Sequence, residues 1–223
     1  MIVSDDRGGL VDQYTKFLMR FDDGFKVQAE PPSLYPEDGL EIKGGYFYSS
    51  YDGSSGYAYN STSDSYGMIN TSKMLRAEDF PDYHPFTIDF WYRPMSDKNS
   101  CHVGHEWIDG LFYFGQSGTE SEGYGLYFAT RKGSFGKKIA DMVSRWYHIA
   151  IVRKTNSRDV SCFCDGKLCA SFYSGIYSLR AKNIDFNRQG DGNNRGSFVI
   201  DDFRISNIAR WDSDFEPPKR KGL

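Results

Sequence analysis

Hydrophobic and polar residues alternate along several short stretches of this chain. In Phe86–Arg93 the apolar residues occupy every second position, which places them on one face of an extended strand. Pro94 ends this stretch, since proline has no N–H to donate to a sheet. Trp146–Arg153 is apolar on both faces, which is typical of a strand inside a sandwich.

Further strands are predicted by similar stretches, which are separated by clusters of Gly, Asn, Asp and Ser. They are Phe17–Phe21, Leu111–Phe114, Tyr124–Ala129, Val160–Cys164, Leu168–Tyr173 and Phe198–Ile205, with one or two more within residues 46–70. Many short strands at regular intervals, with weak helical patterning between them, indicate an all-β sandwich or barrel.

The pair Asp165-Gly166 suits a two-residue type I′ hairpin turn, because both central residues of that turn need a positive φ. Such a turn places Cys162 directly opposite Cys169, on the same face. The two thiols either form a disulfide or stay reduced and buried, and the lack of an export signal favours the reduced form. A zinc site that includes Cys164 would need a fourth ligand, and the cysteine spacings do not repeat.

Composition narrows the classes of function. Aromatic residues make up 17% of the 223 residues, which suits strands, and 23 glycines supply turns. The net charge is −3 and the chain has no basic stripe, so nucleic acid is not an expected partner. The start of the chain has no signal-peptide pattern, and no stretch approaches the roughly 20 apolar residues of a membrane helix, so membrane insertion is not expected.

Four segments in order resemble the laminin-G-like, concanavalin A-like lectin-glucanase superfamily. Phe17–Gly24 is similar to the family's opening LLLHFDG strand, and Phe86–Pro94 to its FTIEFWVRP strand. Trp146–Arg153, followed by Phe163–Lys167, resembles WHHVAVVR…YVDGK. Ile200–Trp211 resembles the closing IDDVRISNVARY strand.

This resemblance implies a two-sheet antiparallel jelly-roll sandwich over residues 14–218. Residues 1–13 are then an N-terminal arm or tail, and residues 219–223 a basic C-terminal tail. The ending Arg210–Pro218 resembles the ARYTADFTPP of laminin-G-like domains in bacteriophage tail and virion proteins. The family's glycoside hydrolases carry Glu-x-Asp-x-Glu on one strand, and this chain has no such run.

Two sets of residues in the chain carry possible metal ligands. The run His102–Glu106 carries possible ligands, but we expect a surface loop there without fixed geometry. Calcium is the better candidate, because hard cations take carboxylates and many relatives carry one calcium near the sandwich edge. The candidate ligands are Asp22 and Asp23, after the opening strand, and Asp201 and Asp202, at the closing strand. The alternative is that one of these acids caps a turn and the others face solvent.

A tyrosine-rich segment carries the candidate ligand-binding residues. Residues 46–66 hold six of the 16 tyrosines among Ser, Gly, Asn and Asp, a mixture found in binding loops. We expect Tyr46, Tyr48 and Tyr51 to form an exposed ligand-binding set, and Trp107, in the long loop 95–110, to mark a second surface. The alternative is a strand pair with half-buried tyrosines.

The sequence therefore predicts a non-enzymatic binding or structural module on a phage or virus particle, as a decoration, fibre or tail component. Its partners would be other virion proteins, cell-surface glycan, or both. A virion protein is made in the host cytoplasm and released by lysis, so it needs no signal peptide. A glycoside hydrolase of the same fold, or a secreted adhesion domain outside the cell, are the alternatives.

Overall fold

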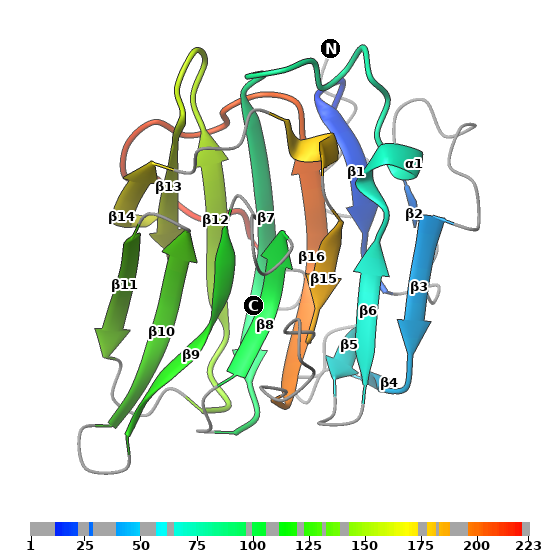
Figure 1. The fold of residues 1–223 in the computed structure, drawn as a ribbon. Helices are drawn as coiled ribbons and strands as arrows, with labels where there is room; N and C mark the ends of the chain where they lie inside the picture. The colour runs from blue at the N-terminus through cyan, green and yellow to red at the C-terminus, as the bar shows by residue number, and fades with distance from the viewer. Residues whose placement is uncertain are drawn as a thin grey trace.

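Two antiparallel β-sheets face each other across one hydrophobic core (Figure 1). The computed structural model describes residues 12–21, 27–28, 39–49, 57–61, 65–96, 100–105, 112–119, 123–130, 133–138, 143–173, 178–181, 183–187 and 196–219. No helix within these ranges is long and apolar enough to cross a membrane. The predicted jelly-roll sandwich is confirmed.

The sheet at the back of Figure 1, sheet A, has the strand order β14-β13-β12-β7-β16-β1-β2. Its strands are β1 (Thr15–Met19), β2 (Val27–Gln28), β7 (Phe86–Pro94), β12 (Tyr147–Arg153), β13 (Asp159–Cys164), β14 (Lys167–Tyr173) and β16 (Phe198–Ser206). Strand β5 (Tyr57–Ser61) pairs with the start of β16, and β4 (Tyr46–Ser49) pairs with β5.

The sheet at the front, sheet B, has the order β11-β10-β9-β8-β15-β6-β3. Its strands are β3 (Leu40–Lys43), β6 (Tyr66–Ile69), β8 (Ser100–His105), β9 (Tyr113–Thr119), β10 (Gly123–Thr130), β11 (Gly133–Lys138) and β15 (Ile184–Phe186). Two short helical turns, α1 (Thr71–Met74) and η3 (Leu179–Ala181), lie at one end of the sandwich (Figure 1).

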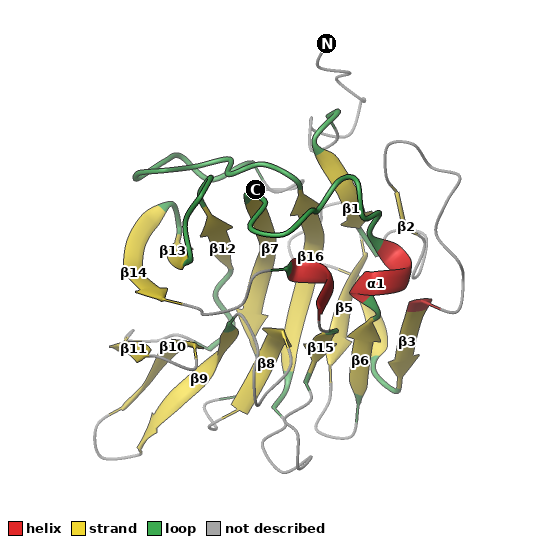
Figure 2. Cartoon of the chain, turned by 45° about the horizontal axis from the view of Figure 1, so that its top comes forward, coloured by secondary structure: helices red, strands yellow, loops and turns green. Residues whose placement is uncertain are grey.

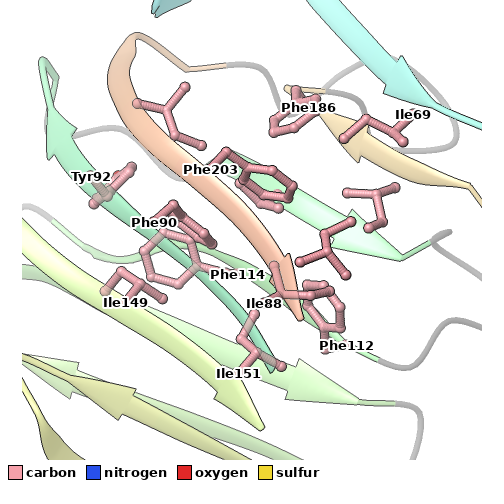
Figure 3. Packing of buried hydrophobic residues seen from close by; sticks show 14 of the residues in the cluster. Ile69, Ile88, Phe90, Tyr92, Phe112, Phe114, Ile149, Ile151, Phe186 and Phe203 are labelled. Atoms are coloured by element: carbon pink, nitrogen blue, oxygen red, sulfur yellow. The ribbon is translucent and has the colours of Figure 1, made fainter. Parts of the chain in front are cut away.

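Aromatic rings from both sheets fill the space between them (Figure 3). Phe90 of β7 stacks on Phe203 of β16, with ring centroids 5.6 Å apart. The ring of Phe114, from β9 of the opposite sheet, forms T-shaped pairs with the rings of Phe90 and Tyr92. The ring centroids are 5.7 and 4.8 Å apart. Alternate positions of β7 supply these inward rings, as the period of two predicts.

The outer face of β12 is also buried, and this explains why its sequence is apolar on both sides. Ala150 and Val152 lie beneath Trp211 and Phe215, whose rings stack at 3.9 Å. These rings belong to residues 207–218, which leave β16 and cross sheet A to the β13–β14 hairpin (Figure 2). We call residues 207–218 the C-terminal strap.

The β13–β14 hairpin has the predicted turn but a different register. Asp165 and Gly166 have φ of 49° and 71°, as a type I′ turn requires. A bulge after Cys162 places this residue opposite Ala170, so the predicted direct pairing with Cys169 is wrong. Both cysteines still pack against the main core, as free thiols. One extra residue in one strand shifts every pairing beyond it.

Candidate functional site

The tyrosine-rich segment forms the strand pair β4–β5 over its described parts. Tyr46 lies opposite Asn60 and Tyr48 opposite Ala58, so the strand-pair alternative holds for the backbone. Tyr51 and Trp107 lie outside the described residues, as do the side chains of Tyr46 and Tyr48. Ligand binding by these four residues stays a prediction.

The closing strand carries its two acids on an irregular stretch of backbone. Asp202 has a φ of 49°, and its N–H donates to Oδ1 of Asp201 at 2.8 Å. Strands β1 and β16 are neighbours, as the calcium hypothesis needs, but Asp22 and Asp23 lie outside the described residues. No group of three or more His, Cys, Asp or Glu side chains gathers in the described part of the chain. Calcium at this edge stays a prediction.

The histidines of the predicted loop 95–110 lie on a strand, so the expectation of a surface loop is wrong for residues 100–105. His102 and His105 of β8 are fully buried. The Tyr92 hydroxyl lies 2.6 Å from Nδ1 of His102, and burial lowers the pKa of His102 to about 3. His105 Nε2 hydrogen-bonds the Leu179 carbonyl at 2.7 Å. His102 is therefore a neutral core residue, because a charged imidazole is unfavourable at this depth, and His105 is a hydrogen-bonded core residue.

One buried charge network resembles catalytic machinery. Asp89 accepts two hydrogen bonds from Arg204, at 2.9 and 2.8 Å, and lies 3.3 Å from Nε2 of His148. Burial raises the pKa of Asp89, but the Arg204 charge and the hydrogen bonds outweigh it and lower this pKa to about 2. A paired Asp and His is also part of hydrolase triads.

The C-terminal strap excludes substrate from this network. The rings of Trp211 and Phe215 lie 5.7 and 5.8 Å from the His148 ring, and Trp91 lies 5.3 Å from it. His148 is 1% exposed. The network therefore joins three strands of sheet A beneath the strap, where a substrate has no access.

The outer face of sheet B combines tyrosines with very small residues. Leu126 and Phe128 of β10 point into the core, so the alternate residue Tyr127 points outward. Tyr127 lies opposite Gly115 of β9 and Gly136 of β11. On the next strand outward-pointing Tyr113 lies between Gly104 of β8 and Ala129 of β10.

The glycines on both neighbouring strands leave the Tyr127 ring with no bulky side chain directly opposite it. Cross-strand side chains normally cover one another. Around Tyr127 they cannot, and both tyrosines remain partly exposed. A Cβ placed on Gly136 would meet the Tyr127 ring at 4.0 Å, so this ring lies over the glycine. We call Tyr113, Tyr127 and the small residues beside them the tyrosine face.

Two carboxylates occupy the other half of the same outer surface. Glu41 of β3 and Asp185 of β15 both lie opposite Met68 of β6. They are thus separated by two strand spacings, about 10 Å between backbones. The Tyr66 hydroxyl donates to Oε1 of Glu41 at 3.4 Å.

Comparison with known proteins identifies the family. A family model described as the concanavalin A-like lectin/glucanases superfamily matches residues 70–214. The chain belongs to this superfamily. No curated protein matches its sequence.

Several solved structures share this concanavalin-like fold. The binding domain of Paraclostridial Mosquitocidal Protein 1 is similar over 90% of this chain and 50% of its own, at a TM-score of 0.61 and 18% identity. The botulinum neurotoxin serotype D binding domain is similar over 89% of this chain and 48% of its own, at a TM-score of 0.59 and 12% identity. The binding domain of botulinum neurotoxin serotype D/C VPI 5993 is similar over 92% of this chain and 51% of its own, at a TM-score of 0.61 and 14% identity. The chain spans about half the length of these proteins, and the likeness shows a shared fold.

The tyrosine face was missed from sequence although Tyr124–Ala129 was predicted as a strand. The concanavalin-like motifs mark inward residues, whereas this face depends on which residues lie beside Tyr127 on two other strands. The Glu41–Asp185 pair was missed because neither β3 nor β15 was predicted. The available signal was the set of alternate positions Gly123, Gly125 and Tyr127, which places one tyrosine beside glycines on the outward face.

Proposed function

We propose that this chain is a non-catalytic module that binds a saccharide on the tyrosine face. The observation that carries the proposal is that Tyr113 and Tyr127 have cross-strand neighbours no larger than alanine. A sugar ring has one apolar face, which packs on an aromatic ring, and hydroxyls that bond to polar groups at the rim. Tyrosine supplies both surfaces at a low entropy cost.

The setting of this binding is a cell surface, with the module carried on a phage or virus particle as a decoration, fibre or tail component. Supporting this are the particle-protein motif at Arg210–Pro218 and the solved toxin structures of this fold, which are themselves binding or receptor-binding domains. Other particle proteins are its further partners. Calcium at Asp201 and Asp202, with Asp22 and Asp23, belongs to the same proposal.

A glycan and bacterial-polysaccharide array tests the binding, followed by titration of the strongest hit. We expect Tyr127→Ala to weaken affinity about tenfold, which corresponds to 1.4 kcal/mol, because one stacking ring is lost. Tyr113→Ala should act in the same direction, and the melting temperature should barely change for either. Tyr14→Ala is the matched control, since Tyr14 is a 40% exposed tyrosine in the turn before β1, away from sheet B.

No binding by the wild-type chain would refute the saccharide proposal and favour a purely structural particle protein. Equal weakening by Tyr14→Ala would show that the tyrosine face is not the site.

A glycoside hydrolase is the second candidate, and the Glu41–Asp185 pair favours it. Inverting hydrolases place two carboxyls roughly 6.5–9.5 Å apart, near the separation that two strand spacings allow. Mass analysis of the bound sugar decides between the candidates. We expect the sugar to remain intact. Cleavage that is lost in both Glu41→Gln and Asp185→Asn, while binding persists, would overturn the non-catalytic proposal.

A further inference from the structure

An exposed arginine in the turn before β13 lies between an exposed tyrosine of the loop before β7 and an exposed tyrosine at the end of β14. Arg158, at the end of the β12–β13 turn, donates from Nη1 to the Tyr173 hydroxyl at 3.2 Å. Its Nη2 donates to the Tyr83 hydroxyl at 3.4 Å, and its guanidinium lies 5.2 Å from the centre of the Tyr83 ring. Tyr83 and Tyr173 are each 41% exposed. We call these three residues the Arg158 cluster.

The loop that carries Tyr83 is held rigidly from below. The buried Arg153 donates from Nε and Nη2 to the carbonyl of His84, at 3.0 and 2.8 Å. His84 Nε2 in turn bonds the Asn207 carbonyl at 2.9 Å. Pro81 and Pro85 flank the segment and restrict its backbone further. Tyr83 is therefore presented on a fixed support.

Tyr83 itself adopts an unfavourable backbone conformation. Its φ is 59°, in the left-handed region that residues with a side chain rarely occupy. The exposed ring returns little burial to the fold for this strain. Strained residues held by well-packed surroundings cluster at binding sites. The turn in which the His84 N–H donates to the Pro81 carbonyl at 3.0 Å holds Tyr83 in this conformation and places its ring at the surface.

We propose that the Arg158 cluster is a second saccharide site, specific for sugars that carry a carboxylate. A guanidinium pairs with a carboxylate in a two-pronged geometry that a neutral sugar does not match. The two phenol rings provide apolar faces and hydroxyls for the sugar ring.

The surroundings favour a saccharide over a protein. The neighbours of the cluster include the polar residues Asp82, Ser157 and Asp159. Asp82 and Asp159 are exposed, and Asp159 lies opposite Tyr173 across the hairpin. A protein interface needs a fully buried apolar centre, which this small set of side chains does not supply. The Ser157 hydroxyl and the two phenol hydroxyls suit the hydroxyls of a sugar, and Arg158 is the group that attracts its carboxylate.

Calorimetric titration of the full chain tests the site. The probes are trigalacturonate and a hyaluronan tetrasaccharide, each beside its carboxyl methyl ester, which keeps the rings and removes the charge. We expect the acids to bind at least tenfold more tightly than the esters. Arg158→Gln should weaken the binding of the acids at least tenfold and leave the melting temperature unchanged.

Arg145→Gln is the matched control. Arg145 is also exposed and lies 5.2 Å from the centre of a tyrosine ring, but that ring belongs to Tyr147, which is 1% exposed. We expect this variant to bind the acids like the wild-type chain. Tyr127→Ala should do so too, which separates this site from the tyrosine face.

Equal binding of acids and esters, or unchanged binding by Arg158→Gln, would overturn the proposal. Absence of acid binding by the wild-type chain would also overturn it. None of these three results would bear on neutral sugars at the tyrosine face.

Discussion

We expect Asp89→Ala to lower the free energy of unfolding by about 3–5 kcal/mol, because it leaves the guanidinium of Arg204 buried without its carboxylate. The side chains of Asp89 and Arg204 are 3% and 4% exposed, so water screens neither charge. Urea denaturation of the variant and the wild-type chain measures the difference.

The double variant Asp89→Ala/Arg204→Leu distinguishes an orphaned charge from lost packing. It removes both charges, so we expect it to be more stable than Asp89→Ala alone. A loss equal to the sum of the single variants would contradict the ion-pair explanation. Lys167→Ala breaks the exposed pair with Asp214 and should change stability very little.

The same pair makes stability depend on acid pH. The pKa of Asp89 is lowered from 3.8 to about 2 in the folded chain, so its contribution is complete above pH 3.8 and is lost as the pH falls towards 2. We expect the stability difference between wild type and Asp89→Ala to shrink over this window. A constant difference from pH 6 to pH 2 would argue against the lowered pKa.

Gly166→Ala should release the C-terminal strap and cost about 3–5 kcal/mol of stability. A Cβ on Gly166 would lie 1.9 Å from the carbonyl oxygen of Phe215, and the φ of 71° is strained for any residue with a side chain. The Phe215 N–H donates to the Gly166 carbonyl at 2.9 Å, so strap and turn are in direct contact. Phe215 is half-buried, so losing its packing supplies part of this cost and the strained φ at position 166 supplies the rest.

Denaturation gives the energy of this change, and hydrogen exchange over residues 207–218 shows whether the strap is released. Gly136→Ala is the control, because a Cβ there meets only the Tyr127 ring, at an ordinary 4.0 Å. We expect that variant to be close to wild type in stability. If the amides of residues 207–218 stayed protected from hydrogen exchange in Gly166→Ala, the turn would have tolerated the methyl group and the prediction would be wrong.

The motif-bearing strands of sheet A were predictable because their patterns are local. Phe86–Arg93 and Val160–Cys164 were placed within a residue or two, and the Asp165-Gly166 turn has the predicted conformation. Strands of sheet B were predicted less well. Residues 100–105 were expected in a loop, and their buried histidines give no apolar alternation although they form strand β8.

The candidate sites depend on residues that are distant in sequence. Arg158 contacts Tyr83, which is 75 positions away in the chain. Tyr127 lies opposite Gly115 and Gly136, which belong to two other strands. Neither arrangement has a local signature. The predicted tyrosine set at Tyr46, Tyr48 and Tyr51 and the calcium acids were chosen from local composition, and they stay predictions.

The amino-acid sequence by itself determined the sandwich, because the period of two in its strands and the chemistry of its turns act over a few residues. Tertiary structure alone decided the register at Cys162, the burial of both faces of β12 and the neighbours of each surface tyrosine. A bulge and a returning strap change contacts between strands without changing the local pattern that a sequence records. Sites formed from side chains on different strands are set by those contacts.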